Sequence, residues 1–391
     1  MLRFWLIVAL VLGTVMGLSW WSLGFVLPTR WLARVRVATA VLDVASLAIF
    51  FAALRWHTAV PEDVKRTAMI VFSMYWMAKL LFVAFVAIAC LARSLYRCVS
   101  APGADGAPPD PARRRLLKGA AAIPGLALAG GVYGGSAGRT RVAVNTIDVP
   151  ISGLGSGLDG FRIAQLSDIH LGLFFSLAEW RALLEKSAAT GADALAVTGD
   201  LFDDDDMNAE AAAILDEFTP RFPKGIWFCY GNHEHFRNIR AIREALSRTR
   251  VRVLRDDAAL VAEGERPLWF AGVDYPMSRS VFAVDGAKSL EAAMKPVPEN
   301  AVKVLLAHHP DFFDGAAQYG VDLALSGHTH GGQFGAFGVP LVPPVFKYMR
   351  GVYRVGSTLG YVHSGNGSWF PYRLGCPPEI AVFTLKKKPD T

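Results

Sequence analysis

The chain has 391 residues, of which 52% are hydrophobic and 19% are charged, with a mean hydropathy of +0.31. This composition is too apolar for an ordinary soluble enzyme and indicates contact with lipid. The net charge of +6 fits the arginine-rich cytoplasmic loops of a membrane protein. Because the second half has no basic patch with interleaved aromatic residues, no nucleic-acid partner is expected.

Three apolar runs near the start of the chain are long enough to span a bilayer. They are residues 4–27, which carry no charge, residues 37–54, interrupted only by Asp43, and residues 67–92, interrupted only by Lys79. We therefore predict three transmembrane helices within residues 1–92, with the lipid bilayer as their partner. A charge inside a spanning helix is costly, so Asp43 and Lys79 either pair with each other or lie near helix ends that face water.

Residues 93–118 are basic and rich in proline and glycine, and we predict a solvated linker there. Residues 119–138 form a fourth apolar segment, which is short and rich in glycine. Two interpretations of this segment stay open. It is either a transmembrane helix or an internal stretch similar to an export signal, because the "RRRLLKG" before it resembles a twin-arginine signal.

The positive charges predict a topology, because cytoplasmic loops are enriched in lysine and arginine. The first loop carries Arg30, Arg34 and Arg36, and the third carries Arg93, Arg97, Arg113, Arg114, Arg115 and Lys118. Both are therefore placed in the cytoplasm. If residues 119–138 span the bilayer, the second half is external, and otherwise it is cytoplasmic. We predict a multi-pass protein of the inner (cytoplasmic) membrane whose second half lies on the external, periplasmic side.

Residues 139–391 differ in composition, with short apolar runs separated by helix-like segments. The predicted strands are "FRIAQL", "DALAVT", "GIWFCY", "PLWFAGV", "VKVLLA", "VDLALS", "LGYVHSG" and "EIAVFTL". The predicted helices are Leu177–Thr190, Ala209–Phe218 and Ile239–Arg248. Strands that alternate with helices predict an α/β domain.

Polar side chains directly follow five of these strands, where α/β folds bind their ligands. They are Asp168 and His170 in "SDIH", Asp200 and Asp203 in "GDLFDDD", Asn232 and His233 in "GNHEH", His308 in "HHPD", and His328 and His330 in "GHTHGG". One such motif is more often a cap or a turn, but five in succession indicate a metal site. Gly199, Gly231 and Gly327 precede three of the motifs and suit sharp turns and close backbone approach.

The types of these side chains indicate which metals they suit. Carboxylate and amide oxygens with imidazole nitrogens, and no thiolate, fit hard-to-borderline divalent ions. A single catalytic ion takes about three protein ligands, so this set is too large for one ion. Two ions that share one carboxylate fit better, and such a pair clamps the attacking and leaving oxygens of a displacement at phosphorus.

The order DxH, GDxxD, GNH, a lone strand-end histidine and GHxH resembles the calcineurin-like metallophosphoesterases, over roughly residues 145 to 386. The stretches "GHTHGGQ" and "SGNGSWFPYRLGCPPEI" look like the membrane-attached bacterial subgroup of that family. The resemblance implies a four-layer αββα sandwich with two divalent ions (Mn, Fe or Zn) at the tops of the sheets. It also implies a hydrolase that cleaves phosphoesters by attack of a metal-bridged hydroxide.

Carried over residue by residue, the resemblance implies a role for each candidate. One ion would be held by Asp168, His170 and His330, the other by Asn232, His308 and His328, with Asp200 bridging both. His233 would act on the leaving oxygen as an acid or an electrostatic stabiliser, and Asp203 would orient it. His309 matches no ligand position, and Asp204–Asp206 are expected to be a solvated acidic loop.

The substrate stays open among a phosphodiester, a phosphomonoester and a pyrophosphate, lipid-linked or from the envelope. One alternative is a pyrophosphatase of the UDP-2,3-diacylglucosamine type in lipid A synthesis, which needs a cytoplasmic site and so conflicts with the predicted topology. Another is a non-catalytic phosphate-binding or scaffold module, whose members would be expected to lose ligands that this sequence keeps. Asp274, Trp369 and Arg373 are either pocket residues or structural ones.

Overall fold

The computed structural model describes residues 2–55, 60–99, 111–277, 282–336, 339–341, 346–368 and 370–388. The chain divides into two compact units, Met1–Ala137 and Gly138–Thr391. We call them the helical unit and the α/β unit.

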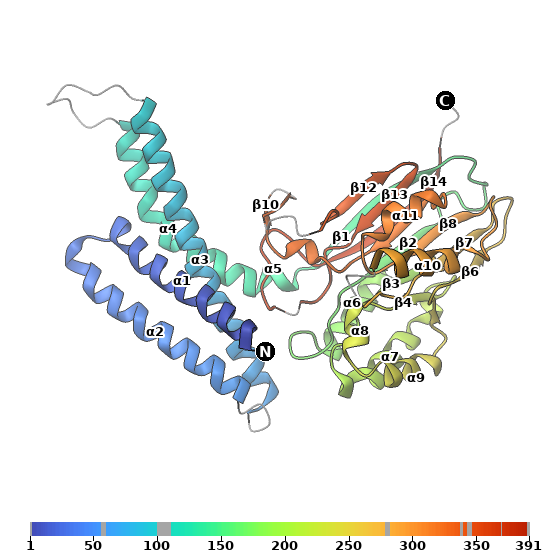
Figure 1. Ribbon diagram of the computed structural model, residues 1–391, viewed down its shortest axis with the longest axis horizontal. Coiled ribbons are helices and arrows are strands. Elements are labelled where there is room, and N and C mark those ends of the chain that lie inside the picture. Colours follow the sequence, from blue (N-terminus) through green and yellow to red (C-terminus); the bar gives the residue numbers. More distant parts are fainter. Residues whose placement is uncertain are drawn as a thin grey trace. The chain divides into compact units, whose positions relative to one another are not determined.

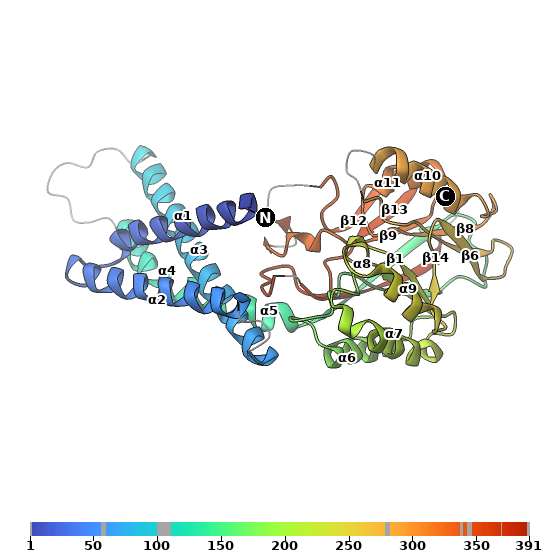
Figure 2. The same cartoon turned by 60° about the horizontal axis from the view of Figure 1, so that its bottom comes forward.

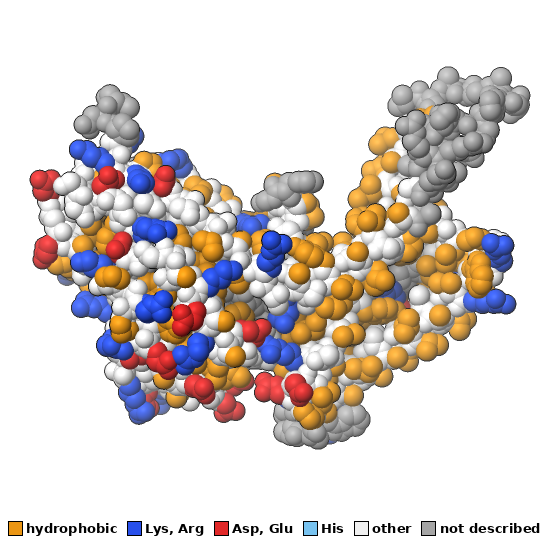
Figure 3. Space-filling model, turned by 180° about the vertical axis from the view of Figure 1, so that it is seen from behind, with side chains coloured by type: hydrophobic (Ala, Val, Ile, Leu, Met, Phe, Trp, Pro, Cys, Tyr) orange, Lys and Arg blue, Asp and Glu red, His pale blue; other side chains and the backbone are white. Residues whose placement is uncertain are grey.

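The helical unit contains four long helices (Figure 1): α1 (Leu2–Val26), α2 (Thr29–Arg55), α3 (Glu62–Val99) and α4 (Pro111–Gly135). Within the described residues, three stretches are long and apolar enough to cross a membrane: Val8–Val26, Thr29–Ala53 and Glu62–Tyr96. Their large apolar side chains are exposed rather than packed inside, as at Leu10 and Val41, and Figure 3 shows hydrophobic side chains along these helices. The three apolar helices identify a membrane protein.

Asp43 of α2 and Lys79 of α3 form a buried ion pair, which confirms one of the two sequence-based interpretations. Lys79 Nζ lies 2.5 Å and 2.6 Å from the two carboxylate oxygens of Asp43, and the Tyr75 hydroxyl donates to the same carboxylate over 2.6 Å. Lys79 Nζ also lies 5.2 Å from the ring centre of Trp76. The carboxylate and the ammonium each find an opposite charge within the helical unit.

The α4 helix runs antiparallel to α3 and packs closely against it through glycines. A Cβ on Gly131 would lie 2.7 Å from the Cβ of Ala78, and one on Gly135 would collide with Met74. Small residues four apart let membrane helices approach in this way. Both ends of the expected linker at 93–118 are helical, because α3 continues to Val99 and α4 begins at Pro111, a residue suited to a helix start. Residues 100–110 lie outside the described residues.

The α/β unit has two six-stranded mixed sheets. The first has the order β1 (Ala143–Ile151), β14 (Glu379–Lys387), β2 (Arg162–Leu166), β3 (Ala194–Thr198), β4 (Ile226–Cys229) and β5 (Arg252–Val253). The second has the order β12 (Gly351–Val355), β13 (Thr358–Val362), β9 (Leu323–Ser326), β8 (Val302–Leu306), β7 (Leu268–Gly272) and β6 (Asp257–Ala262). A short hairpin, β10 (Gly335–Ala336) with β11 (Val339–Pro340), follows β9.

The sheets pack face to face with helices on both outer faces (Figure 2). The first sheet is covered by α6 (Leu177–Ala188), α7 (Asn208–Glu217) and α9 (Ile239–Ser247), and the second by α10 (Phe282–Met294) and α11 (Phe312–Gln318). The remaining helices are short: α5 (Ala137–Thr140), which crosses the boundary between the units, and α8 (Asn232–Phe236). The prediction of apolar helices followed by a four-layer αββα domain is confirmed.

The strand β3 shows why this layering follows from the sequence. Ala194 and Ala196 lie in the core between the sheets, whereas Leu195 and Val197 pack against the outer helices. Alternate side chains of a strand point to opposite faces, so a strand apolar at every position needs cover on both sides. Because β2, β3 and β4 are mutually parallel, as are β7, β8, β9 and β13, the loops that follow them gather at one end of the unit. We call it the carboxyl end.

Candidate metal centre

The nine predicted site residues all lie at the carboxyl end, in the segments that directly follow strands. Asp168 and His170 follow β2, Asp200 and Asp203 follow β3, Asn232 and His233 begin α8 after β4, His308 follows β8, and His328 and His330 follow β9. Three sets of side chains have ligand atoms close enough to hold a metal ion. The first is Asp168–His170–His330, the second is Asp200–His308–His328, and the third, which overlaps both, is His170–Asp200–His233. Both sheets therefore contribute to a single cluster.

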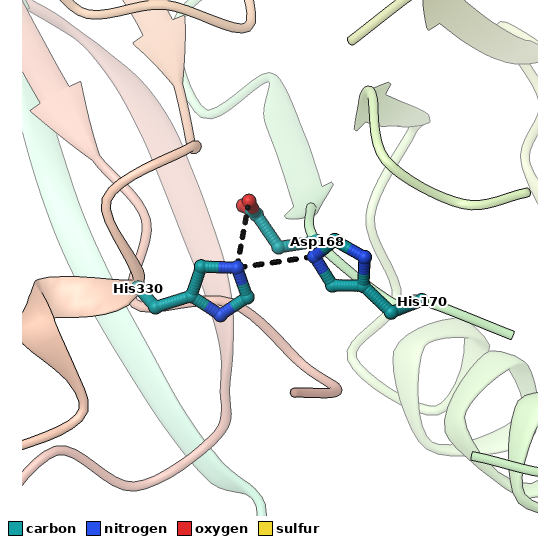
Figure 4. Close-up of side chains that lie close together, drawn as sticks. All are labelled: Asp168, His170 and His330. Carbon is teal, nitrogen blue, oxygen red and sulfur yellow. Dashed lines mark hydrogen bonds and ion pairs between the residues drawn. The ribbon is translucent and has the colours of Figure 1, made fainter. Parts of the chain in front are cut away.

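The first set joins Asp168 and His170 to His330 (Figure 4). His330 Nε2 lies 3.1 Å from His170 Nε2 and 3.4 Å from Asp168 Oδ1. Two ring nitrogens that face each other can share only one proton, so this arrangement does not satisfy both imidazoles by hydrogen bonding alone. A cation between the nitrogens and the carboxylate would satisfy all three.

The second set joins Asp200, His308, His328 and Asn232. His308 Nε2 lies 3.2 Å from Asp200 Oδ2, and His328 Nδ1 lies 2.8 Å from Asn232 Oδ1 and 3.3 Å from His308 Nε2. His308 Nδ1 is directed to the carbonyl oxygen of Thr198 over 2.7 Å, which fixes the ring and turns Nε2 toward the cluster. The set again brings imidazole nitrogens and side-chain oxygens to one point.

Asp200 lies between the two sets. Its Oδ2 is 3.2 Å from His308 Nε2 of the second set and 3.8 Å from His170 Nε2 of the first. The same carboxylate oxygen of Asp200 is therefore close to a histidine of the first set and to a histidine of the second set. The donor set of oxygen and imidazole nitrogen, convergent and almost fully buried, fits divalent cations.

His233 and Asp203 form a hydrogen-bonded pair beside the first set. His233 Nδ1 lies 2.8 Å from Asp203 Oδ1, and the imidazole rings of His233 and His170 meet edge to face at 4.4 Å. The Arg237 guanidinium donates to the same Asp203 oxygen over 2.6 Å and 2.9 Å. Burial would lower the pKa of His233, but the hydrogen bond to Asp203 and the charge of Asp200 raise it above its ordinary value.

The pKa values of Asp200 and His308 are shifted in opposite directions by their mutual attraction. Burial would raise the pKa of Asp200, but the charge and hydrogen bond of His308 hold it well below its usual range. Burial would lower the pKa of His308, but Asp200 and Asp168 raise it to about 10. Without an added cation, His308 therefore holds a proton at neutral pH and serves as the positive charge of the cluster.

The two histidines of "GHTHGG" have lowered pKa values, in contrast to His308. Burial and the charges of His308 and His309 lower the pKa of His328 to about 2. Burial, His170 and Arg373 also lower the pKa of His330 well below its ordinary value. Both imidazoles are therefore neutral, with lone pairs available as metal ligands require.

Five of the predicted ligands have left-handed backbone conformations: Asp168, His170, Asp200, His328 and His330, with φ between 49° and 71°. Such conformations are uncommon for residues other than glycine, and they gather at functional sites where the surrounding fold holds them. The strain lies in the backbone of these residues, and no side-chain pattern in the sequence reveals it. The loops are therefore shaped to turn these side chains inward.

The three glycines that precede motifs are required by close approach. A Cβ on Gly199 would lie 2.6 Å from the backbone nitrogen of Gly231 and 2.8 Å from His308 Nδ1. A Cβ on Gly231 would collide with the Asp200 carboxylate, and one on Gly327 with Ser167 and Asp168. Alanine at any of the three would displace a predicted ligand, which confirms the expected close backbone approach.

Two further residues brace the cluster, and the first of them, Glu234, was not predicted from the sequence. Glu234 is fully buried, and its carboxylate accepts hydrogen bonds from the backbone N–H groups of Asp200, Leu201, Phe202 and Gly231. A glutamate at the third position of a helix that follows a glycine is the signal of a helix-start cap, and it was present in "GNHEH". Glu234 thus ties the loop after β3 to the loop after β4.

The second is Arg373, which sequence analysis left open as a pocket or structural residue. It is fully buried and donates to the carbonyl oxygens of Ser364, Gly367 and Cys376, while Nη2 lies 3.3 Å from His330 Nδ1. Its position behind His330 makes it a structural residue. Asp274 likewise binds His235 and Arg255, and Trp369 lies outside the described residues.

Aromatic side chains surround the second set. The Tyr275 ring lies 5.7 Å from His328 and 5.9 Å from His308, and the Phe346 ring lies 5.1 Å from His328. His309 packs on His328 at 4.6 Å, and its Nδ1 accepts from the backbone of Asp311, away from the ligand atoms. These rings place apolar surface beside the imidazoles of the second set.

The chain was compared with protein families, with curated proteins and with solved structures. A family model described as calcineurin-like phosphoesterase matches residues 161–332. The uncharacterized metallophosphoesterase YkuE of Bacillus subtilis is 32% identical over 286 residues, 70% of this chain and 97% of that protein. A Danio rerio transmembrane protein with metallophosphoesterase domain is 30% identical over 268 residues, 66% of this chain and 60% of that protein. A solved Danio rerio dimetal phosphatase aligns with a TM-score of 0.36 at 11% identity, over 58% of this chain and 93% of that one.

Proposed function

We propose that this chain, which belongs to the calcineurin-like phosphoesterase family and is a hydrolase of phosphoesters, is anchored in a membrane and holds a dinuclear metal centre. The observation that carries the proposal is the position of Asp200 between two sets of converging ligands. One ion would be held by Asp168, His170 and His330, and the other by Asn232, His308 and His328, with Asp200 bridging them.

Each part of the cluster has a defined task in this proposal. Two divalent cations bound there would polarise the phosphoryl group and supply hydroxide near neutral pH. Asp200 and Asp168 offset the charge of the cations, and the neutral rings of His328 and His330 present lone pairs without first losing a proton. Seven side chains from loops after five strands fix the positions of these groups before a substrate arrives.

His233 would act on the leaving oxygen. Asp203 accepts from His233 Nδ1, so the ring is held with Nε2 directed away from Asp203. The pKa of His233 is raised above its ordinary value, which favours the protonated ring that can donate a proton to the departing alkoxide. Arg237 donates to the same Asp203 oxygen that accepts from His233, which helps to keep the pair in one orientation.

The location of the α/β unit follows in this proposal from the packing of α4. Because α4 runs antiparallel to α3, the chain leaves the helical unit on the side of the loop between α2 and α3. The end of α3 at Val99 and the start of α4 at Pro111 lie at the other end of these helices, and the arginines of segment 93–118 favour the cytoplasm. The α/β unit would then lie on the external, periplasmic side of the inner membrane.

An external site favours a phosphodiester, phosphomonoester or pyrophosphate of the envelope, including a lipid-linked one. It disfavours the UDP-2,3-diacylglucosamine type of pyrophosphatase, whose nucleotide substrate is cytoplasmic. A non-catalytic phosphate-binding or scaffold module is disfavoured because His233 is retained and paired with Asp203.

The proposal is tested by the metal content and activity of the purified full-length chain. We expect about two transition ions per fully loaded chain and hydrolysis of bis(p-nitrophenyl) phosphate that depends on them. His233→Ala should lower the rate about 100-fold or more while both ions stay bound.

The matched control is His235→Ala, two residues along the same helix, where the side chain pairs with Asp274 instead of Asp203. It should keep most of the activity. Equal hydrolysis by the wild type and His233→Ala would overturn the assigned role of His233, and one ion per loaded chain would overturn the dinuclear centre.

A further inference from the structure

The exposed apolar side chains of the α/β unit are distributed unevenly. Eight large hydrophobic side chains are exposed in the described part of this unit. Single exposed apolar residues are ordinary on a soluble surface, so their number alone has no meaning. Their positions along the strands show which end of the unit each one occupies.

Four of the eight lie in loops or turns at the carboxyl end. Phe236 ends α8 after β4, Met277 follows β7, and Val339 and Leu341 lie at and just after the hairpin strand that follows β9. The Phe236 ring lies 5.4 Å from His233, so this side chain borders the metal centre. Val339 and Leu341 are 62% and 65% exposed, among the most exposed apolar side chains of the unit.

Three more lie at the same end by strand register. Val352 pairs with Tyr361, one residue before β13 ends, and Val284 lies in the first turn of α10, which follows β7. Val144 pairs with Ile380 of β14, and β14 is antiparallel to β2, so the beginnings of β1 and β14 lie where β2 ends. Among the eight exposed apolar residues in the described part of this unit, only Tyr319 lies at the opposite end. It follows α11 and precedes β9.

The covalent chain enters the α/β unit at this same end. Residues 136–142 connect α4 to β1, and β1 begins at the carboxyl end. At about 3.3–3.6 Å per residue, this connection reaches at most about 25 Å. The helical unit has three stretches able to span a bilayer, so the carboxyl end is tethered close to a membrane surface.

We propose that the carboxyl end of the α/β unit docks on the surface of the bilayer that the helices span, with Phe236, Met277, Val339 and Leu341 entering the interfacial layer. Apolar side chains on a surface that is held at a bilayer gain free energy by burial among headgroups and the first acyl carbons. The tether supplies the proximity and these four side chains supply the contact. This docking does not depend on the chemistry proposed for the metal centre.

The test uses the full-length chain in phosphatidylcholine–phosphatidylglycerol vesicles that contain spin-labelled lipid with the label high on the acyl chain. Bimane is attached to Leu341→Cys, to Met277→Cys or, as the matched apolar control, to Tyr319→Cys. The background carries Cys90→Ala and Cys98→Ala, and Cys229 and Cys376 are buried. We expect at least about twofold stronger quenching by spin-labelled lipid at Leu341 and Met277 than at Tyr319.

A double variant sharpens the result. Val339→Asp with Leu341→Asp should lower the quenching at bimane-labelled Met277, whereas Tyr319→Asp should leave it unchanged. Equal quenching at all three positions, or quenching at only one of Leu341 and Met277, overturns the proposal. So does protection of Leu341 from a water-soluble quencher without quenching by lipid, which would show that a protein covers this end.

Discussion

The helical unit and the α/β unit both bury charged side chains, but they neutralise them differently. Asp43 is buried with Lys79, which donates to both of its oxygens, and with the hydroxyl of Tyr75. In the α/β unit, imidazole nitrogens instead face one another, at 3.1 Å between His170 and His330 and at 3.3 Å between His308 and His328.

This difference separates a structural ion pair from a binding site. The Asp43–Lys79 pair has equal and opposite charges and a full set of donors and acceptors, so it needs no further group. The cluster at the carboxyl end has imidazole nitrogens that face one another, and in the proposed function added cations complete it. Burial is similar in the two places, so the composition and direction of the groups carry the distinction.

The largest expected effect comes from breaking the pair in the helical unit. Lys79→Met leaves the Asp43 carboxylate buried without its cation, and we expect a loss of about 3–5 kcal/mol in stability. The loss is measured by detergent-driven unfolding in mixed micelles, with Arg93→Met at an exposed position as the control. The double variant Lys79→Met with Asp43→Leu removes both charges and should recover most of that stability. If it does not, the ion pair depends on groups other than Asp43 and Lys79.

Breaking the cluster should instead affect metal binding. Asp200→Asn keeps the size of the side chain but removes the charge shared by the two sets of ligands. We expect hydrolysis of bis(p-nitrophenyl) phosphate to fall at least about 100-fold, since even outer partners of metal ligands cost up to that factor. Mass spectrometry of bound metal should show less than the wild-type content. If Asp200→Asn binds as much metal as the wild type and is fully active, Asp200 does not bridge two metal ions.

The brace between two loops should show a mixed effect. Glu234→Gln replaces a carboxylate that accepts four backbone hydrogen bonds with an amide that has one acceptor oxygen. We expect a loss of about 2 kcal/mol in the thermal stability of the α/β unit and weaker metal binding. Glu244→Gln, on an exposed helix face, is the matched control, and an equal effect of the two variants would rule out the brace.

The smallest effect is a dependence of metal affinity on pH. Burial lowers the pKa of His308, but the neighbouring aspartates raise it to about 10 in the absence of a cation, so a proton occupies this ring at pH 7. A cation must displace that proton. Affinity should therefore rise up to about tenfold per pH unit as the pH rises from neutrality toward that pKa. Calorimetry in buffers of different ionisation enthalpy would detect the released proton, and an affinity independent of pH would contradict the prediction.

The sequence predicted the strands that bear the site because each is an uninterrupted apolar run followed by glycine and polar residues. The helix α6 was placed to within two residues, since Ser176 and Glu179 form a capping box at its start. β1 and β12 were not predicted, because their side chains alternate between exposed and half-buried and give no continuous apolar run.

The site was predicted as a set of residues but not as a geometry. The five left-handed ligands depend on loops held by contacts from elsewhere, such as Asn366 Oδ1, which accepts from the backbone of Ser167. Arg373 lies 43 residues from His330 in the chain, so no local pattern joins them. The helical ends of segment 93–118 were not predicted, because proline and glycine are typical of a linker, whereas the flanking arginine, leucine and alanine residues favour a helix.

The separation of ligands along the chain has a consequence for biogenesis. His170 and His330 are 160 residues apart, so the first set of ligands is assembled only after β9 and the loop that follows it have been made. Ions therefore cannot enter that set during early synthesis, and they are drawn from whichever compartment holds the chain when folding ends. For an enzyme that completes its fold outside the cytoplasm, the available ions of that compartment would decide which metals the protein carries.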